Sequence, residues 1–223
     1  MKYSAIIPVR AGSRRLPNKN ILPFGNSNLL IHKIRQLKKV VQIDEIVVSS
    51  DSDIMLEMAQ KEGVKVHKRP IEYADEKTKT FGEVVAYCAE NACQGENVIW
   101  APCVCPLCDE YNFSDAINKY EELVLNKKEY DSVISAKLFK EYLWDEEKPL
   151  NYKLGMGHVP SQQLPNYQVI VNGFYIAPRL KMIEWNYFFG LKPYRLIISK
   201  KEAVDIDDKD DFEIAKALLN NGE

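Results

Sequence analysis

The sequence predicts an α/β fold whose central sheet is mainly parallel and doubly wound. Short apolar runs alternate with longer segments whose apolar residues recur at helical spacing, and this alternation continues along most of the 223 residues. The first run, Tyr3 to Val9, leads straight into a loop containing glycine and serine, as a buried parallel strand does. A chain of this length suits a single domain, residues 1–223.

The individual elements follow from periodicity and from end signals. Leu30, Ile34, Leu37 and Val41 share one helical face, and Gly63 stands where a helix C-terminal cap is favoured. The expected strands are 3–9, 45–50, 64–68, 97–101, 132–137, 169–176, 194–198 and a last one ending at Asp205; the expected helices are 29–41, 53–62, 81–91, 111–125 and 209–219. Repeated strand–helix units imply parallel pairing of successive strands.

The alternation breaks between residues 139 and 168. This stretch contains Trp144, several prolines and two glycines, and it has no clear periodicity. We expect an irregular insertion at 139–168 that acts as a lid or a dimerisation element, because function concentrates on loops carried by a rigid scaffold.

Composition limits the partners and the compartment. A net charge of −2 disfavours nucleic acid, and no apolar run is long enough to span a bilayer. Five cysteines in no regular framework favour a reducing compartment, so we expect a cytoplasmic protein. Cys103, Cys105 and Cys108 raise the possibility of zinc, but a fourth ligand at matching spacing is missing from the sequence.

The strongest local signal is the loop after the first strand, within IIPVRAGSRRLPNKNI, residues 6 to 21. Gly12 permits a tight backbone that can approach a phosphate. Four cations lie within ten residues: Arg10, Arg14, Arg15 and Lys19. Ligands of open α/β sheets bind at the carboxyl ends of strands, so we expect this loop to hold a polyphosphate. A solvated basic turn is the alternative.

A pair of acids near the C-terminus predicts a metal site. In VDIDDKDDF, residues 204 to 212, Asp205 and Asp207 are two apart at an expected strand end, which points both side chains to one face. Two carboxylates that meet a triphosphate form a hard-oxygen site for Mg²⁺. The following acids, Asp208, Asp210 and Asp211, are expected only to favour the start of a helix, and helix capping is also the alternative for Asp207.

These segments resemble the CMP-sugar synthetases, the acylneuraminate and 3-deoxy-octulosonate cytidylyltransferases. The first loop is similar to their opening signature R-x-x-S-[RK]-x-L-P-x-K-N, and similarity recurs in order at residues 47–53, 68–80 and 204–212. The resemblance implies a Rossmann-like nucleotidyltransferase fold, a homodimer, and Mg²⁺ bound by Asp205 and Asp207. It implies catalytic roles for Arg10, Lys19 and Asp207, and nucleotide-binding roles for Arg10, Gly12, Ser13, Arg14, Lys19, Asn20, Arg69 and Thr80.

We therefore predict a cytidylyltransferase that joins CMP from CTP to an acidic, nonulosonate-like sugar or a similar small anionic acceptor and releases pyrophosphate. The acceptor oxygen attacks the α-phosphorus in line, and positioning and electrostatics supply most of the rate. The alternatives are a phosphorylated acceptor giving a CDP-linked product, a nucleotidyltransferase for another base or for a sugar 1-phosphate, and a catalytically silent nucleotide-binding module. The resemblance implies a role in capsule or surface-polysaccharide biosynthesis.

The resemblance is weakest where the acceptor should bind. The family's Q-P-T-S-P-L-R segment is APCVCPLCD here, residues 101–109, and Ser161 stands where an arginine is expected. Losing an arginine removes a two-pronged carboxylate partner, which a lysine replaces only as a point charge. We assign acceptor binding to Lys137, Gln162, Gln163 and Asn172, with Lys140 as a further candidate cation.

Overall fold

A seven-stranded sheet forms the centre of the computed structural model, which describes residues 2–13, 15–75 and 77–220. The strand order is β5-β4-β1-β6-β8-β7-β9. All pairs are parallel except those of β8 with β6 and β7, which confirms the predicted mainly parallel sheet. The strands are β1 (Tyr3–Pro8), β4 (Glu45–Ser50), β5 (Lys65–Lys68), β6 (Asn97–Trp100), β7 (Ser132–Phe139), β8 (Tyr167–Pro178) and β9 (Pro193–Ile197); β2 (Pro23–Phe24) and β3 (Ser27–Asn28) form a separate hairpin.

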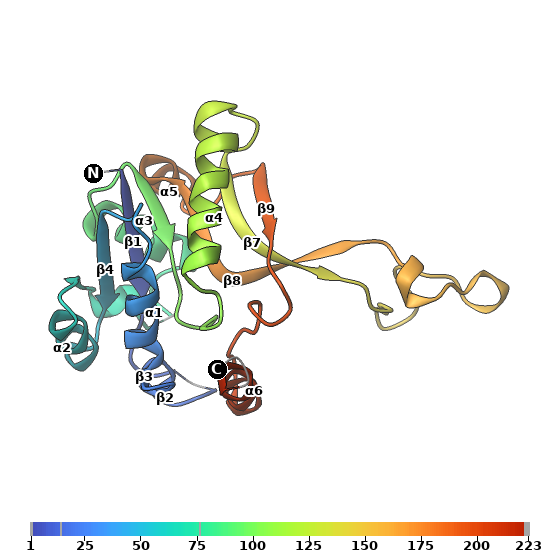
Figure 1. Cartoon of the computed structure of the whole chain (residues 1–223), viewed down its shortest axis with the longest axis horizontal. Coiled ribbons are helices and arrows are strands. Elements are labelled where there is room, and N and C mark those ends of the chain that lie inside the picture. The colour runs from blue at the N-terminus through green and yellow to red at the C-terminus, as the bar shows by residue number, and fades with distance from the viewer. Residues whose placement is uncertain (1, 14, 76, 221–223) are drawn as a thin grey trace.

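Helices cover both faces of the sheet (Figure 1). They are α1 (Leu29–Lys38), α2 (Asp53–Lys61), α3 (Phe81–Asn91), α4 (Glu110–Tyr120), α5 (Arg179–Trp185) and α6 (Lys209–Asn220). One apolar layer joins the sheet to α1, α2, α4 and α6, and the other joins it to α3 and α5. Successive residues of β6 alternate between the layers, with Ile99 in the first and Trp100 in the second, as the pleat of a strand requires.

Several segments differ from the expected elements. The helix expected at 29–41 ends at Lys38, and Val41, expected on its apolar face, is 93% exposed. The hairpin of β2 and β3 was not expected. Helix α5 has no counterpart among them, and α4 ends at Tyr120 and continues as a π-helical turn, Glu121–Asn126. The last expected strand, ending at Asp205, is wrong. A turn at residues 199–203 takes the chain away from the sheet, and Ile206 N–H then donates to Val104 O at 2.8 Å, in the loop after β6.

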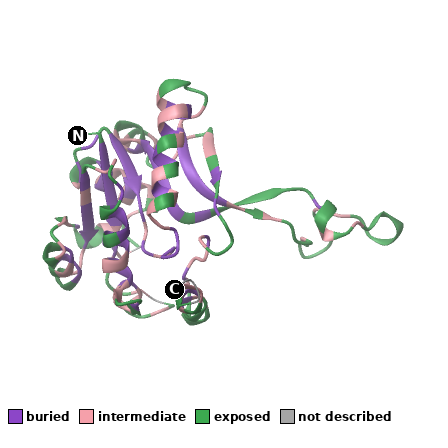
Figure 2. Ribbon diagram, in the orientation of Figure 1, coloured by how far each residue is buried: buried purple, intermediate pink, exposed green. Residues whose placement is uncertain are grey.

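An arm extends from the body where β7 and β8 run on past the sheet as a two-stranded ribbon (Figure 1). Its end, residues 140–166, contains the one-turn 3-10 segments Gly155–Gly157 and Ser161–Gln163. Most of the arm is exposed (Figure 2). Tyr142 packs against Tyr152 and stacks on His158 there, so the tip is held by its own aromatic rings.

Candidate functional site

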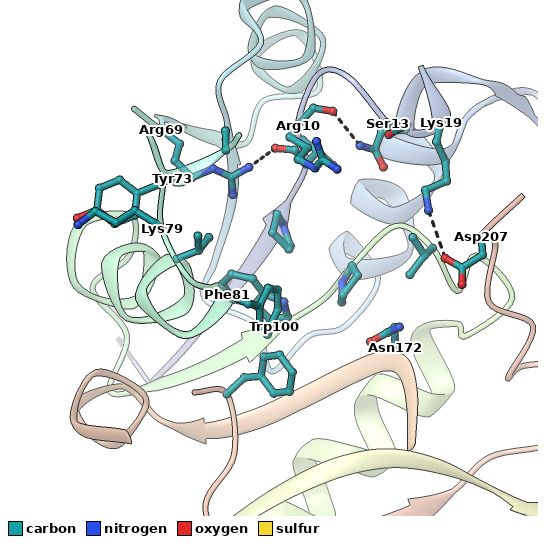
Figure 3. A pocket seen from close by; sticks show the side chains of 18 of the residues that line it. Arg10, Ser13, Lys19, Arg69, Tyr73, Lys79, Phe81, Trp100, Asn172 and Asp207 are labelled. Carbon is teal, nitrogen blue, oxygen red and sulfur yellow. Dashed lines mark hydrogen bonds and ion pairs between the residues drawn. The ribbon is translucent and has the colours of Figure 1, made fainter. Parts of the chain in front are cut away.

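The main cavity, about 710 Å³, opens at the carboxyl ends of β1 and β6. Open α/β sheets bind ligands at this end. Lys19 and Asp207 lie on one side of the cavity, and Arg69 and Lys79 lie with the rings of Tyr73 and Phe81 on the other (Figure 3). Its lining includes Arg10, Ser13, Arg15, Lys19, Asn20, Arg69, Tyr73, Lys79, Thr80, Phe81, Trp100, Val104, Asn172, Tyr175, Phe188 and Asp207.

The cationic loop, residues 10–20, and the end of β1 before it are held by hydrogen bonds from three side chains to backbone atoms. Asp51 Oδ1 accepts the Ala11 N–H at 3.0 Å, Arg69 Nη2 donates to Val9 O at 2.7 Å, and Asn20 Nδ2 donates to Arg10 O at 3.4 Å. Gly12 has a φ of +72°, a conformation that favours glycine. These contacts bring Arg10, Ser13, Lys19 and Asn20 to the cavity as the sequence predicts, whereas Arg14 lies outside the described residues.

Asp207 contacts two cations of this loop at the edge of the cavity. Arg15 Nη2 donates to Asp207 Oδ1 at 2.6 Å, and Lys19 Nζ lies 4.0 Å from the same oxygen. Lys19 Nζ also donates to Ile206 O at 2.7 Å. Burial lowers the pKa of Lys19, and the nearby carboxylates of Asp207 and Asp205 oppose that shift. The two charged halves of the predicted site therefore share one cleft.

Asp205 lies next to this ion pair and is partly buried. Its Oδ2 accepts from Asn172 Nδ2 at 2.7 Å, and burial raises the pKa of its carboxyl group. Its Oδ1 is buried and, among the described residues, has no hydrogen-bond partner. A buried unpaired carboxylate oxygen is costly unless something binds it, so Asp205 with Asp207 fits a hard cation.

The other acids cap α6. Asp208 Oδ1 accepts the N–H groups of Asp210 and Asp211 at 2.9 and 3.1 Å, as predicted for a helix start. Within residues 2–13, 15–75 and 77–220, no group of three or more His, Cys, Asp or Glu side chains is placed to hold a metal. A cation at Asp205 and Asp207 would therefore need further oxygens from a substrate or from water.

Arg69 and Thr80 border the opposite wall. Arg69 is only 4% exposed, and its Nε is buried with no partner among the described residues. The Thr80 hydroxyl caps α3, accepting the Glu83 N–H at 3.3 Å and donating to Glu83 Oε2 at 2.9 Å. Thr80 thus lines the cavity while its side chain is engaged in a capping box.

An aromatic wall completes the cavity and was not foreseen from the sequence. Phe81 and Trp100 make an edge-to-face pair with centroids 6.4 Å apart, and Tyr175 stacks on Phe188 at 3.9 Å. Phe81 follows the cap of α3 and Trp100 ends a strand, which is a positional signal for a binding site. Nothing in the sequence shows that Phe188, a distant residue, meets them.

The predicted acceptor residues divide into two groups. Asn172 lines the cavity and contacts the metal segment, residues 205–207, through its bond to Asp205. Its Oδ1 accepts from Tyr175 O–H at 2.7 Å, which ties it to the aromatic wall as well. Lys137 lies on the ribbon opposite Val169, and Gln162 and Gln163 lie at the end of the arm, where Lys140 Nζ donates to Gln162 O at 2.7 Å. The ribbon carries the two glutamines away from the cavity of their own chain, whereas Lys137 lies at the base of the ribbon, near enough to the cysteine loop for its charge to act on Cys105. The acceptor role of all three stays a prediction.

The cysteine loop, residues 101–108, contributes Pro102 and Val104 to the cavity lining, whereas its cysteines do not line the cavity. Cys103, Cys105 and Cys108 are buried free thiols, and burial raises the pKa of Cys103 and Cys108 to about 12. Such thiols stay protonated at neutral pH.

No helix in the described part of the chain is long and apolar enough to cross a membrane.

Comparisons with known proteins bear on what this cleft does. The sequence pattern of a family described as cytidylyltransferase matches residues 4–160, more than half of the chain. The N-acylneuraminate cytidylyltransferase of Escherichia coli O18:K1:H7 is 25% identical over 96% of this chain and 51% of that protein, so the chain spans about half the length of this relative. The pseudaminic acid cytidylyltransferase of Campylobacter jejuni is 27% identical over 98% of this chain and 96% of that protein.

Solved structures share the fold at lower sequence identity. A CMP:2-keto-3-deoxy-manno-octonic acid synthetase, complexed with CTP, superposes with a TM-score of 0.71 at 12% identity over 100% of both chains. A 4-diphosphocytidyl-2C-methyl-D-erythritol synthase from Anaerococcus prevotii gives a TM-score of 0.65 at 17% identity over 98% of both chains. These likenesses establish the Rossmann-like nucleotidyltransferase fold.

Proposed function

Because the chain belongs to the cytidylyltransferase family, and so is a nucleotidyltransferase, we propose that it transfers CMP from CTP to an acidic sugar and releases pyrophosphate. Relatives named for N-acylneuraminate and for pseudaminic acid support an acidic sugar acceptor, and we favour a nonulosonate-like one. The five free cysteines support a reducing compartment, the cytoplasm.

The observation that carries this proposal is the contact of Asp207 with Arg15 and Lys19 in the lining of one cleft. Basic groups on one side suit the β- and γ-phosphates of CTP, whose charge grows as pyrophosphate leaves. Arg10 and Ser13 line the same side, and Arg69 with Tyr73 lines the wall beyond β1. The cleft therefore has separate places for a polyphosphate and for the rest of a nucleotide.

Asp205 and Asp207 would hold the Mg²⁺ that accompanies CTP. The metal, when bound, neutralises phosphate charge and orients the α-phosphate. The chain's own residues do the rest: Asn172 fixes Asp205 through its Nδ2, and Lys19 fixes the backbone between the two acids at Ile206 O. Arg15, which lines the cleft beside Asp207, carries a guanidinium that could pair with two phosphate oxygens.

The acceptor would enter between Asn172 and the aromatic wall of Phe81 and Trp100. We also propose that the protein is a homodimer. The arm presents exposed apolar side chains, and a second copy would bury them and bring the amides of Gln162 and Gln163 near another surface.

The proposal is tested by turnover with each of the four nucleoside triphosphates in the presence of Mg²⁺, followed as pyrophosphate release. N-acetylneuraminate, pseudaminate and 3-deoxy-octulosonate serve as acceptors, and a phosphorylated polyol serves as the comparison. We expect release with CTP and one acidic sugar, and a product whose mass is that sugar plus CMP. A CDP-linked product would replace the acceptor class, and CTP binding without turnover on any acceptor would contradict catalysis.

A further inference from the structure

The cysteine loop, residues 101–108, is hydrogen-bonded to the metal segment, residues 205–207. Val104 O accepts the N–H of Ile206, the residue between the two acids, at 2.8 Å. Ile206 is fully buried, and its carbonyl is held from the cleft side by Lys19. The same loop also contacts the neighbouring strand: a Cβ added to Gly173 would lie 3.2 Å from Cys108 Sγ. Any shift of the cysteine loop would therefore move Asp205 and Asp207.

Three side chains of helix α1 contact backbone carbonyl oxygens of this loop. Lys33 Nζ donates to Cys105 O at 3.1 Å and to Cys108 O at 2.8 Å. Gln36 Nε2 donates to Pro106 O at 2.8 Å, and His32 Nε2 lies 3.1 Å from the same oxygen. Without these donors, the buried carbonyls of Cys105, Pro106 and Cys108 would lose these hydrogen bonds.

Lys33 is the unusual member of this group. Its side chain is 0% exposed, although lysine is among the residues least often fully buried. Its ammonium nitrogen lies 4.9 Å from the centre of the Phe113 ring, so two carbonyls and an aromatic face surround it. Because it is fully buried, it cannot touch a substrate. An apolar residue would cover α1 at a lower desolvation cost, which points to a role in fixing the loop.

We infer that Lys33 is a positioning residue for the reaction: by fixing Cys105 O and Cys108 O it sets the position of Val104, and through Ile206 the position of the metal-binding acids opposite Lys19. This inference rests on the proposed function, since it concerns the metal of that site. None of the described residues of α1 lines the cleft. The inference therefore gives α1 an indirect role, which is to hold the residues of the cleft in position.

The decisive variant is Lys33→Met, which keeps an unbranched side chain and removes both hydrogen bonds. A displacement of about 1 Å at a reacting group can lower a rate roughly 100-fold. We expect kcat to fall roughly 10- to 100-fold and the Mg²⁺ concentration for half-maximal rate to rise roughly tenfold. The affinity for CTP without metal should change little, because Arg10 and Arg69 are held by other contacts.

The readout that does not depend on turnover is binding of Mn²⁺ to the protein with CTP and without acceptor, followed by electron paramagnetic resonance. Glu45→Gln is the matched control. Glu45 is also buried, accepting from Ser4 Oγ at 2.5 Å and from Gln94 N at 3.2 Å, but it lies at the opposite end of the strands. It should lower Tm and leave Mn²⁺ binding unchanged.

If Lys33→Met does not fold, Gln36→Leu carries the test with the same expected direction, since it removes the bond to Pro106 O. A folded Lys33→Met protein with wild-type kcat and wild-type Mn²⁺ binding would overturn the inference, whatever its Tm. If the wild-type protein itself binds no Mn²⁺ with CTP, the metal part of the proposed function fails instead.

Discussion

At the scale of single residues, the charged and polar groups of the site are paired with one another. Arg15 occupies Asp207, Asn172 occupies one oxygen of Asp205, and Lys19 lies between the two acids. Exposed ion pairs such as Arg15–Asp207 contribute at most about 1 kcal/mol, so a metal with a triphosphate can displace this one readily. Stability and function therefore separate at Asp207.

Replacing Asp207 with alanine should abolish turnover and leave the fold intact. Its side chain is 48% exposed and it packs against no core layer, so little stability is lost. Loss of a metal ligand and of its charge should lower kcat/KM at least about 100-fold. Arg10→Ala should lower kcat/KM to a similar extent, because it removes a cation that would bind the phosphates of CTP. Pyrophosphate release and thermal melting measure the two effects.

Asp53→Ala is the matched control, because Asp53 is exposed and forms an ion pair with Lys68 away from the cleft lining. Wild-type turnover in either Asp207→Ala or Arg10→Ala would remove that residue from the catalytic set.

The sequence predicted those residues whose neighbours along the chain explain them. The loop from Arg10 to Asn20 and the pair Asp205 and Asp207 each form a local pattern, and the structure brings residues of the loop and Asp207 to one cleft. Phe188 and Tyr73 could not be predicted, because they reach the cavity from separate connections and only the folded sheet brings them together. The role of the buried lysine on α1 was equally invisible, since a single lysine in a helix normally indicates a solvated face.

At the scale of elements, periodicity found the strands that are buried on both faces and missed the segment that depends on another loop. Residues 204–207 alternate as a strand does, yet their hydrogen bond goes to Val104 in a loop, so no sheet strand forms. Helix α5 escaped prediction because it is one short element of seven residues, Arg179–Trp185, following a proline. The arm was predicted only as irregular sequence, because its ribbon is a continuation of two strands whose length no local signal limits.

Helix α1 should make the fold sensitive to acid through His32. Burial, with Lys33 beside it, lowers the pKa of His32 to about 4 from 6.5. In the unfolded chain the imidazole takes up a proton below pH 6.5, whereas in the folded chain it resists protonation until about pH 4. Protonation therefore favours unfolding, and the contribution of neutral His32 to stability is lost as pH falls from about 6.5 to about 4.

Between pH 7 and pH 5 the free energy of unfolding should drop by about 2 kcal/mol more in the wild type than in His32→Gln, which keeps an N–H donor near Pro106 O. Urea unfolding at the two pH values measures the difference. His158→Gln, at an exposed position on the arm, should behave like the wild type. Equal pH dependence in the wild type and in His32→Gln would show that His32 is protonated without cost.

At the scale of the whole molecule, the arm is the feature that a monomer explains least. Two-stranded ribbons are marginally stable alone in water, and this one exposes apolar side chains along its length. Leu138 and Ile170 on the ribbon are each 47% exposed, and Met156 at the tip is fully exposed. The body, by contrast, has two closed apolar layers. Our proposal of a homodimer rests on this contrast, since a second copy of the chain would cover the exposed side chains of the arm.

Shortening the arm should therefore separate assembly from folding. Phe139 and Tyr167 are paired across the ribbon, so an Asn-Gly turn in place of residues 140–166 can close it as a two-residue hairpin. We expect light scattering to give a dimer mass for the wild type and a monomer mass for the shortened chain, with the melting of the body retained. Leu180→Ser, at a 68% exposed position of α5, should leave the wild-type mass unchanged. A monomeric wild type at micromolar concentration, or a shortened chain that keeps the dimer mass, would contradict assembly through the arm.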